Sequence, residues 1–282
     1  MPSILQSVLL LIATCAHAQM AEEIVAIRFR AVVGDQELAC GKSYAGIGST
    51  RSTITPRDFR FYVHNLRWID EAGSELPLEL KQDEKWQLDD LALLDFEDAT
   101  GACRNGTPDT NRQILAAMPA GARIRGLRFT LGVPMKLNHT DLLAMPSPLN
   151  LTALAWVWNT GRTFARLDFS STGVPRGYTL HLGSTSCTPD DSSSSIPTKC
   201  LAPNRPEVEL LNFDPGKDSV LADLAALLKD SNVDEAGVCM SSLSTPACGP
   251  IFSNFGLPFP GQPLRPQSFF RSSAASIVLK NK

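Results

Sequence analysis

The sequence predicts an all-β protein: an antiparallel β-sandwich or open barrel with one or two short helices, stapled by disulfides. Short runs of alternating apolar and polar residues recur along the chain and are divided by turn-forming Gly, Pro, Asn and Asp. Segments with the apolar spacing of an amphipathic helix are scarce. Six of the seven cysteines lie beyond residue 18, an even number typical of secreted proteins with paired cysteines.

The expected strands follow this alternation. The first covers 23–34 and ends at a turn signal. The second covers 56–69. Its Phe59 and Phe61 fall on one face and His64 on the other, because successive side chains of a strand point to opposite faces. The remaining strands are expected at 76–80, 86–96, 123–131, 154–158, 163–169, 178–182 and 207–213.

The best helix is expected at 218–229, where leucines recur on one face and Asp218 is a natural N-cap. The region 138–143 predicts one further helical turn. From about residue 258 Pro and Gly predominate, so this tail is expected to be irregular. Residues 19–282 are expected to form one domain, because all-β chains of this length are often single domains.

The first eighteen residues resemble a secretory signal peptide. An apolar run at 4–13, too short to span a bilayer, precedes the small-x-small pattern that ends at Ala18. Cleavage after Ala18 is the prediction, with lipidation at Cys15 as the alternative. No later run has the length and apolarity of a transmembrane helix. The mature protein is therefore expected in the periplasm, at the cell surface or in the medium.

The six remaining cysteines are expected to form structural disulfides. Sequence alone does not choose among their fifteen pairings. Proximity favours Cys239 with Cys248 around a turn-like segment, and Cys187 with Cys200 around a polar one. Cys40 and Cys103 then remain. No CxxC or CxxCH pattern is present, which argues against a zinc ribbon, a thioredoxin motif or haem attachment.

Charge and motifs exclude several function classes. The formal net charge is −3 and the signs are interspersed, which argues against nucleic-acid binding because phosphate contacts need a basic face. There is no GxSxG nucleophile elbow, phosphate loop or paired-carboxylate signature. We therefore assign no catalytic residue and do not expect an enzyme.

The candidate ligands of a transition metal are histidines and methionines, because the cysteines are expected to be oxidised. His64, His139 and His181 are the histidines, and Met135 and Met145 flank His139. The structural alternative for each histidine is a hydrogen-bonded side chain in a packed interior, and for each methionine a place in the core.

Two further groups of residues are candidates for a functional role. Trp156 and Trp158 share one strand face, where a core or rim aromatic pair is the structural alternative to a functional one. An acidic loop has enough oxygen ligands for a structural calcium ion, although it lacks EF-hand spacing and a solvated turn is the alternative. Its oxygen-bearing residues are Asp95, Glu97, Asp98, Asn105, Asp109 and Asn111.

Five segments of the chain resemble the MbnP-like copper-binding family: FRFYVHNLRW, LALLDFEDATGACRNGT, GLRFTLGVPMKLNHTD, PSPLNLTALAWVW and LHLGSTSC. The resemblance covers about residues 24–257. It implies a β-rich fold, copper binding outside the cytoplasm and a di-haem partner related to the MauG peroxidases. It also implies a four-cysteine motif, matched here by Cys40, Cys103, Cys187 and Cys200.

The resemblance also implies the ligands. In relatives, two histidines and a kynurenine hold copper(I), and the kynurenine is an oxidised tryptophan two residues before the first histidine. His64 and His181 match the two histidines, and His139 lies in a further family motif. The tryptophan position is Tyr62 here, which cannot become kynurenine. Either copper is bound differently, or another tryptophan is modified. Trp156 and Trp158 are the foremost candidates for that modification, ahead of Trp86 and Trp68.

The sequence thus predicts a periplasmic or secreted protein that binds copper, with Cu(I) favoured, for copper acquisition or storage. Imidazole and thioether ligands suit Cu(I), which tolerates low coordination numbers. The alternative is a structural or interaction β-sandwich without metal, in which the histidines are incidental.

Overall fold

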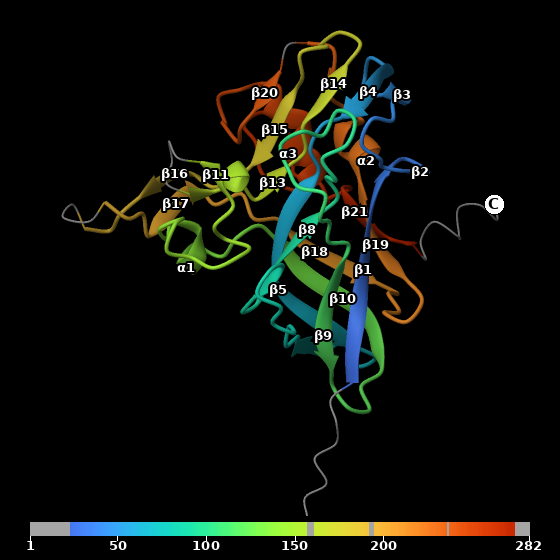
Figure 1. The fold of residues 1–282 in the computed structure, drawn as a ribbon, viewed down its shortest axis with the longest axis vertical. Helices are drawn as coiled ribbons and strands as arrows, with labels where there is room; N and C mark the ends of the chain where they lie inside the picture. Colours follow the sequence, from blue (N-terminus) through green and yellow to red (C-terminus); the bar gives the residue numbers. More distant parts are fainter. Residues whose placement is uncertain (1–22, 157–160, 192–194, 236, 274–282) are drawn as a thin grey trace, which may run out of the picture.

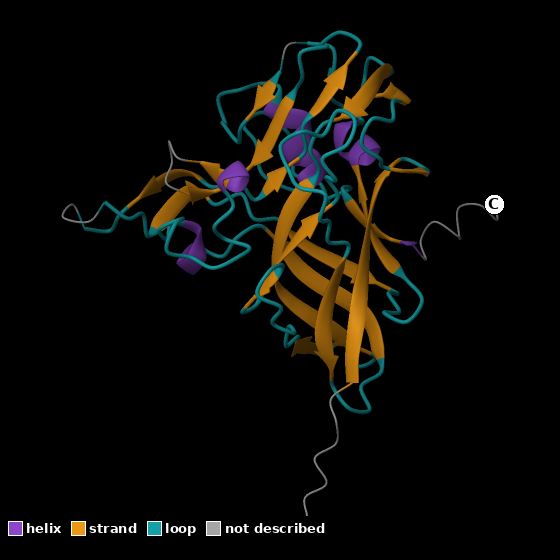
Figure 2. Ribbon diagram, viewed as in Figure 1, coloured by secondary structure: helices purple, strands orange, loops and turns teal. Residues whose placement is uncertain are grey.

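The computed structural model describes residues 23–156, 161–191, 195–235 and 237–273. Strands dominate these residues (Figure 2), and most belong to two sheets. The five-stranded sheet contains β1 (Glu23–Val33), β2 (Gln36–Glu37), β9 (Gln113–Met118), β19 (Ser219–Asp223) and β21 (Phe270–Ser272). The nine-stranded sheet contains β5 (Arg60–Asp70), β6 (Glu75–Pro77), β7 (Gln87–Leu88), β8 (Leu91–Asp95), β10 (Ile124–Leu131), β13 (Ala165–Arg166), β15 (Thr179–Leu182), β18 (Glu207–Leu211) and β20 (Val238–Cys239).

The two sheets face each other through an aromatic core. The ring of Phe29 on β1 lies 6.2 Å from that of Phe61 on β5 and 5.9 Å from that of Phe129 on β10. Phe270 on β21 joins them, 5.4 Å from Phe61. Burial of such rings is the main favourable contribution to folding. The predicted all-β sandwich with unclosed sheets and few helices is confirmed, although β1–β19 and β15–β20 pair in parallel.

Other segments of the chain cover the outer face of the nine-stranded sheet, and the candidate site lies in these segments. The segment from 134 to 155 contains α1 (Met135–Asn138) and the 3-10 turn η1 (Thr152–Leu154). Tyr62, on the outer face of β5, donates a hydrogen bond from its hydroxyl to the Pro148 carbonyl at 2.7 Å and is fully buried. Both faces of β5 are therefore inside the protein.

Three smaller sheets complete the fold (Figure 1). β3 (Tyr44–Ile47), β4 (Ser52–Pro56) and β14 (Phe169–Ser171) form one. β11 (Ala155–Trp156) pairs with β12 (Gly161–Arg162), and β16 (Thr185–Thr188) pairs with β17 (Lys199–Ala202). Together with α1, the β16–β17 hairpin and β11 form an arm at the side of the sandwich, on the left in Figure 1.

The predicted helix at 218–229 is wrong in its first half. Residues 219–223 form β19, which pairs in parallel with β1, and only Leu224–Leu228 form the helix α2. The cap is Asp223, whose carboxylate accepts hydrogen bonds from the amides of Ala225 and Ala226. Pairing with β1 satisfies the backbone of 219–223, a long-range contribution that outweighs local helix propensity.

The chain after 247 is more regular than its composition indicates. Cys248–Phe255 form the helix α3, which ends at Gly256 in the left-handed conformation (φ 74°). The prediction of an irregular tail from about 258 is wrong for β21, which pairs with β19 through Phe270. The buried rings of Phe269 and Phe270 explain this order, because they fill the core. No helix among the described residues has the length and apolarity needed to cross a bilayer.

The disulfides are the two pairs that proximity favours and the pair that then remains. Cys40 bonds Cys103, Cys187 bonds Cys200 and Cys239 bonds Cys248. Cys187 and Cys200 lie directly opposite each other on β16 and β17. The predicted signal peptide, residues 1–18, lies outside the described residues, as does Cys15.

Candidate metal centre

His139 follows α1 directly and lies in the arm, where its side chain is held by its neighbour Asn138. The Asn138 carbonyl oxygen Oδ1 accepts a hydrogen bond from the backbone amide of Arg162 at 2.9 Å. The other amide atom is therefore the NH2 group, which donates to Nε2 of His139 at 2.9 Å. Nε2 thus carries the lone pair of the neutral ring, the form in which imidazole binds a metal.

The Cys200 sulfur lies close to this nitrogen and to the sulfur of Met135. Sγ of Cys200 lies 3.7 Å from Nε2 of His139 and 3.9 Å from Sδ of Met135. Ligand atoms of His139, Cys187 and Cys200 all lie within 4.8 Å of one another. Among the described residues this is the one group of three or more His, Cys, Asp or Glu side chains with metal-like spacing. Imidazole and thioether ligands suit soft metal ions, Cu(I) among them, whereas the two cysteine sulfurs of this group are joined in a disulfide.

A pocket of about 430 Å³ lies beside this cluster. His139, Trp156 and Ile196 are among its lining residues. The Trp156 ring packs on Gly183, where an added Cβ would approach Cζ3 of the ring to 2.6 Å. The structure therefore brings His139 and Trp156, two predicted site residues, to one pocket. Trp158 lies outside the described residues.

His64 lies on the outer face of β5 and is buried. Its Nδ1 donates to the Gly132 carbonyl at 2.8 Å, so Nε2 carries the lone pair in the neutral ring. Burial lowers the pKa of His64, and this outweighs the opposing effects of the Gly132 carbonyl and Asp90. The ring is therefore neutral at physiological pH.

His181 lies on β15 and contacts a carboxylate. Its Nε2 donates to Asp168, 3.1 Å from Oδ1. Burial raises the pKa of Asp168. The hydrogen bond from His181 and the charge of Arg166 lower this pKa, and together with the other lowering effects they outweigh burial, so the net shift is downward. Nδ1 of His181 is buried and has no hydrogen-bond partner among the described residues. A carboxylate behind one imidazole nitrogen is a common arrangement for a histidine ligand.

His64 on β5 and His181 on β15 stand on strands that are two apart, with β13 between them. His181 pairs with Arg166, and Arg166 pairs with Arg60, four residues before His64 on β5. Four residues span about 13 Å along a strand and two strand spacings add about 9.5 Å across the sheet, so the Cα atoms are roughly 16 Å apart. Their joint ligation of one ion, which the family resemblance implies, stays a prediction that would need rearranged side chains.

The acidic loop after β8 does not form a cluster of three ligand atoms among the described residues. Asp95 Oδ1 accepts from the Glu97 amide at 2.9 Å, and Glu97 Oε1 accepts from the Ala99 amide at 2.9 Å. Asp109 pairs with Lys85 at 2.7 Å. These contacts are those of a hydrogen-bonded turn. The structural calcium ion stays a prediction, which the effect of a chelator on the melting temperature tests.

Sequence reasoning missed two residues that organise the candidate site. Asn138 precedes His139, and the dipeptide gave no sign that its amide would hold the imidazole. Asp168 is the last residue but one of the expected strand 163–169, where alternation alone gives no partner for it. Both act through contacts between distant segments. Met145, a predicted candidate ligand, is half-buried and packs against the hydrophobic core.

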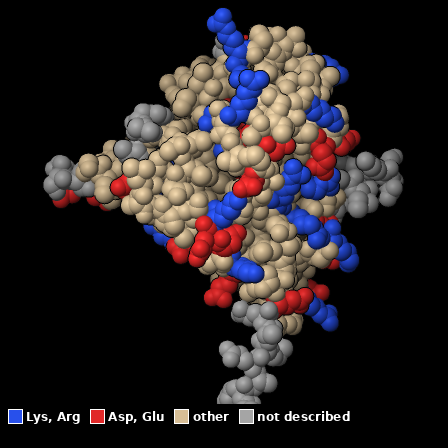
Figure 3. Space-filling view, viewed as in Figure 1, with Lys and Arg blue, Asp and Glu red and all other residues tan. Residues whose placement is uncertain are grey.

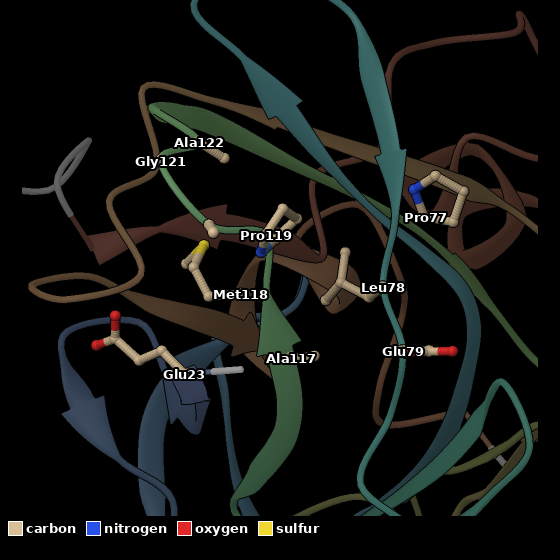
Figure 4. A pocket seen from close by; sticks show the side chains of 10 residues that line it. Glu23, Pro77, Leu78, Glu79, Ala117, Met118, Pro119, Gly121 and Ala122 are labelled. Atoms are coloured by element: carbon tan, nitrogen blue, oxygen red, sulfur yellow. The ribbon is translucent and has the colours of Figure 1, made fainter. Parts of the chain in front are cut away.

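A larger pocket, of about 680 Å³, lies at the far end of the sandwich between β9 and the segment after β6. Figure 4 shows Glu23, Met118 and Glu79 around it. Its lining contains no histidine or cysteine, so it lacks the ligand set of the arm. In Figure 3 charged side chains gather over the body of the sandwich, whereas uncharged ones cover most of the arm. Leu143, Ile196 and Leu201 are exposed there.

Comparison with known proteins assigns the chain to a family. The family model described as MbnP matches residues 22–241. The structure of MbnP from Methylosinus trichosporium matches with 30% sequence identity and a TM-score of 0.75, covering 89% of this chain and 98% of that one. A search of curated proteins finds no significant match. The MbnP resemblance predicted from the sequence motifs is thereby confirmed, and the chain belongs to the MbnP family.

Proposed function

We propose that this protein binds copper outside the cytoplasm, for copper acquisition or storage, and is not an enzyme. Membership of the MbnP family supports a copper-related role. The observation that carries the proposal is the convergence of Nε2 of His139 with the sulfur atoms of Met135 and Cys200. Three disulfides support a location in an oxidising compartment.

The ligands proposed for copper in the disulfide-bonded protein are Nε2 of His139 and Sδ of Met135. One imidazole and one thioether suit Cu(I), which is soft and accepts low coordination numbers. The arm shields these atoms, because His139 is buried and Met135 is half-buried. In the neutral ring Nε2 is the unprotonated nitrogen, so binding needs no change of tautomer, but copper would take the place of the Asn138 NH2 group that now donates to Nε2.

Trp156 is the tryptophan that we propose is oxidised to kynurenine. It lines the same pocket as His139, and it lies on β11 in the arm, where it pairs with Gly161 of β12. Conversion of tryptophan to kynurenine adds one oxygen and removes one carbon, and a di-haem partner related to the MauG peroxidases would supply the oxidation. The new carbonyl and amine groups would face the pocket beside His139.

The first experiment is metal analysis together with peptide mass spectrometry on protein purified from its native host. We expect copper near one per chain and a Trp156 peptide that has gained one oxygen and lost one carbon. Copper without this change would support a site made by the unmodified chain and exclude the kynurenine. Neither copper nor modification, even after copper and the di-haem partner are supplied, would leave the interaction module without metal as the better description.

Single variants then locate the site. Cu(I) affinity is measured by competition with a chromophoric Cu(I) chelator. We expect His139→Ala to weaken binding by more than tenfold, with His64→Ala and His181→Ala as matched controls on other strands. The reverse result, in which His64→Ala and His181→Ala abolish binding and His139→Ala does not, would assign copper to the pair implied by the family resemblance.

A further inference from the structure

We propose that the Cys187–Cys200 disulfide is a redox gate: its reduction permits a second mode of copper binding, and its oxidation prevents that mode. When it is reduced, the two thiolates join Nε2 of His139 and Sδ of Met135 around one Cu(I) ion. This inference rests on the proposed copper function and adds to it a state with four protein ligands. The juxtaposition of a disulfide, an imidazole and a thioether in the arm carries it.

The spacing of the ligand atoms fits one tetrahedral ion. Metal–sulfur bonds of about 2.3 Å and metal–nitrogen bonds of about 2.0 Å place neighbouring tetrahedral ligands roughly 3.5–3.8 Å apart. Sγ of Cys200 is 3.7 Å from Nε2 of His139 and 3.9 Å from Sδ of Met135. Breaking the sulfur–sulfur bond lets the two cysteine sulfurs move apart to a similar spacing. No large movement of the backbone is required.

The disulfide is the most accessible of the three. Cys187 and Cys200 are both half-buried, whereas Cys239 and Cys248 are no more than 1% exposed and the third pair joins the half-buried Cys40 to Cys103, which is 1% exposed. Exchange with a thiol needs access of the attacking thiolate to a sulfur atom. We therefore expect a reductant to reach Cys187–Cys200, the one pair with both residues half-buried, before it reaches Cys40–Cys103 or the buried Cys239–Cys248.

The hairpin that carries the two cysteines is held at its base by other bonds. Ser184 donates from its hydroxyl to the Pro203 carbonyl at 2.8 Å, and the Asn204 side chain donates to the Gly183 carbonyl at 2.8 Å. β16 and β17 also pair through Thr185 and Ala202. These contacts persist when the disulfide opens, so both sulfurs stay beside His139.

The chemistry balances with a dithiol as reductant. The dithiol gives two electrons and two protons to the disulfide, yields two cysteine thiols, and itself becomes a disulfide. Binding of Cu(I) then displaces the two thiol protons, because the thiolate is the ligand. Thiolate ligands bind Cu(I) far more strongly than a disulfide, so reduction raises affinity and oxidation releases the ion.

The test uses the whole mature protein with its disulfides intact. Mild anaerobic treatment with dithiothreitol, followed by its removal, is expected to expose two thiols that alkylation and peptide mapping assign to Cys187 and Cys200. Cu(I) affinity is then measured by chelator competition for the oxidised and the reduced protein. We expect reduction to tighten binding at least 100-fold, to produce an ultraviolet Cu(I)–thiolate absorption and to protect both cysteines from alkylation.

Further variants distinguish this inference from a general effect of thiols. Met135→Leu and His139→Asn should each remove much of the gain on reduction, whereas Met118→Leu, a matched methionine change on β9 outside the arm, should leave it. Cys187→Ser with Cys200→Ser should abolish the gain.

Two outcomes would overturn the gate: equal affinity of the oxidised and reduced forms, or copper protection of Cys40, Cys103, Cys239 or Cys248 instead. Copper binding by the oxidised form without a gain in affinity on reduction would contradict the redox gate but not the proposed copper function. A gain from no binding to tight binding would support the gate and overturn the disulfide-bonded site.

Discussion

Sγ of Cys200 lies 3.7 Å from Nε2 of His139, although the two residues are 61 positions apart in the chain. His139 follows a one-turn helix and Cys200 lies on a hairpin strand, so only the folding of the arm brings them together. The contact places the nitrogen that we propose binds copper against a sulfur of the Cys187–Cys200 disulfide. The binding and redox properties proposed for the arm both depend on it.

Asn138→Ala is expected to destabilise the protein by about 1–3 kcal/mol, because the buried amide of Arg162 loses its acceptor. Chemical denaturation measures the change in unfolding free energy. Asn150→Ala is the matched control, since the Asn150 side chain is exposed and its hydrogen bond is to the Ser147 hydroxyl. Equal stability of the two variants would show that Asn138 does not hold the arm.

Gly183→Ala is expected to displace the Trp156 ring, because the new Cβ would lie 2.6 Å from Cζ3 of that ring. The shift of a buried indole should lower the melting temperature and change the tryptophan fluorescence. It should also reduce the kynurenine yield when the di-haem partner is supplied. Gly216→Ala, at an exposed turn, serves as control and should change none of the three. Unaltered fluorescence in Gly183→Ala would contradict the packing described.

Asp95→Asn is expected to improve stability at pH 8 relative to pH 5. Burial raises the pKa of Asp95 to about 7, because its effect outweighs the lowering by the charge of Arg60 and by the hydrogen bond from the Glu97 amide. The unfolded carboxyl has a pKa of about 3.9, so the native state loses stability as pH rises between about 4 and 7. Asparagine keeps the Oδ1 acceptor for the Glu97 amide without the charge.

Urea unfolding of Asp95→Asn and the original protein at both pH values checks this. Asp109→Asn, at an exposed position, controls for loss of a negative charge. A difference between Asp95→Asn and the original protein that is the same at pH 5 and pH 8 would show that Asp95 does not titrate with a raised pKa.

The three disulfides are expected to differ in their contributions to stability. Cys40–Cys103 closes a loop of 63 residues and Cys187–Cys200 one of 13. Chain entropy alone gives about 4 kcal/mol for the longer loop and about 3 kcal/mol for the shorter one. Double serine variants of each pair, compared by denaturation, measure this. A larger loss from Cys187→Ser with Cys200→Ser would show that the hairpin disulfide has a structural role beyond its loop.

Much of the fold was predictable because it depends on local patterns. Alternation placed β1, β5, β10, β15 and β18 within a few residues of their positions. The error at 219–223 has a physical cause: Val220, Leu221 and Ala222 suit a helix locally, but β1 offers them a parallel partner from about 190 residues away. Such pairing energy is invisible to a local pattern.

The sequence by itself determined the fold class, the preferred disulfide pairs and the family, since these follow from residue types, spacing and motifs along one chain. Tertiary structure alone decided which candidate ligands meet. His64 and His181 match a motif but stand on strands two apart, whereas His139 meets Met135 and Cys200 because the chain returns through the β16–β17 hairpin. A ligand set is a property of distances in space, and these are set by packing and strand register.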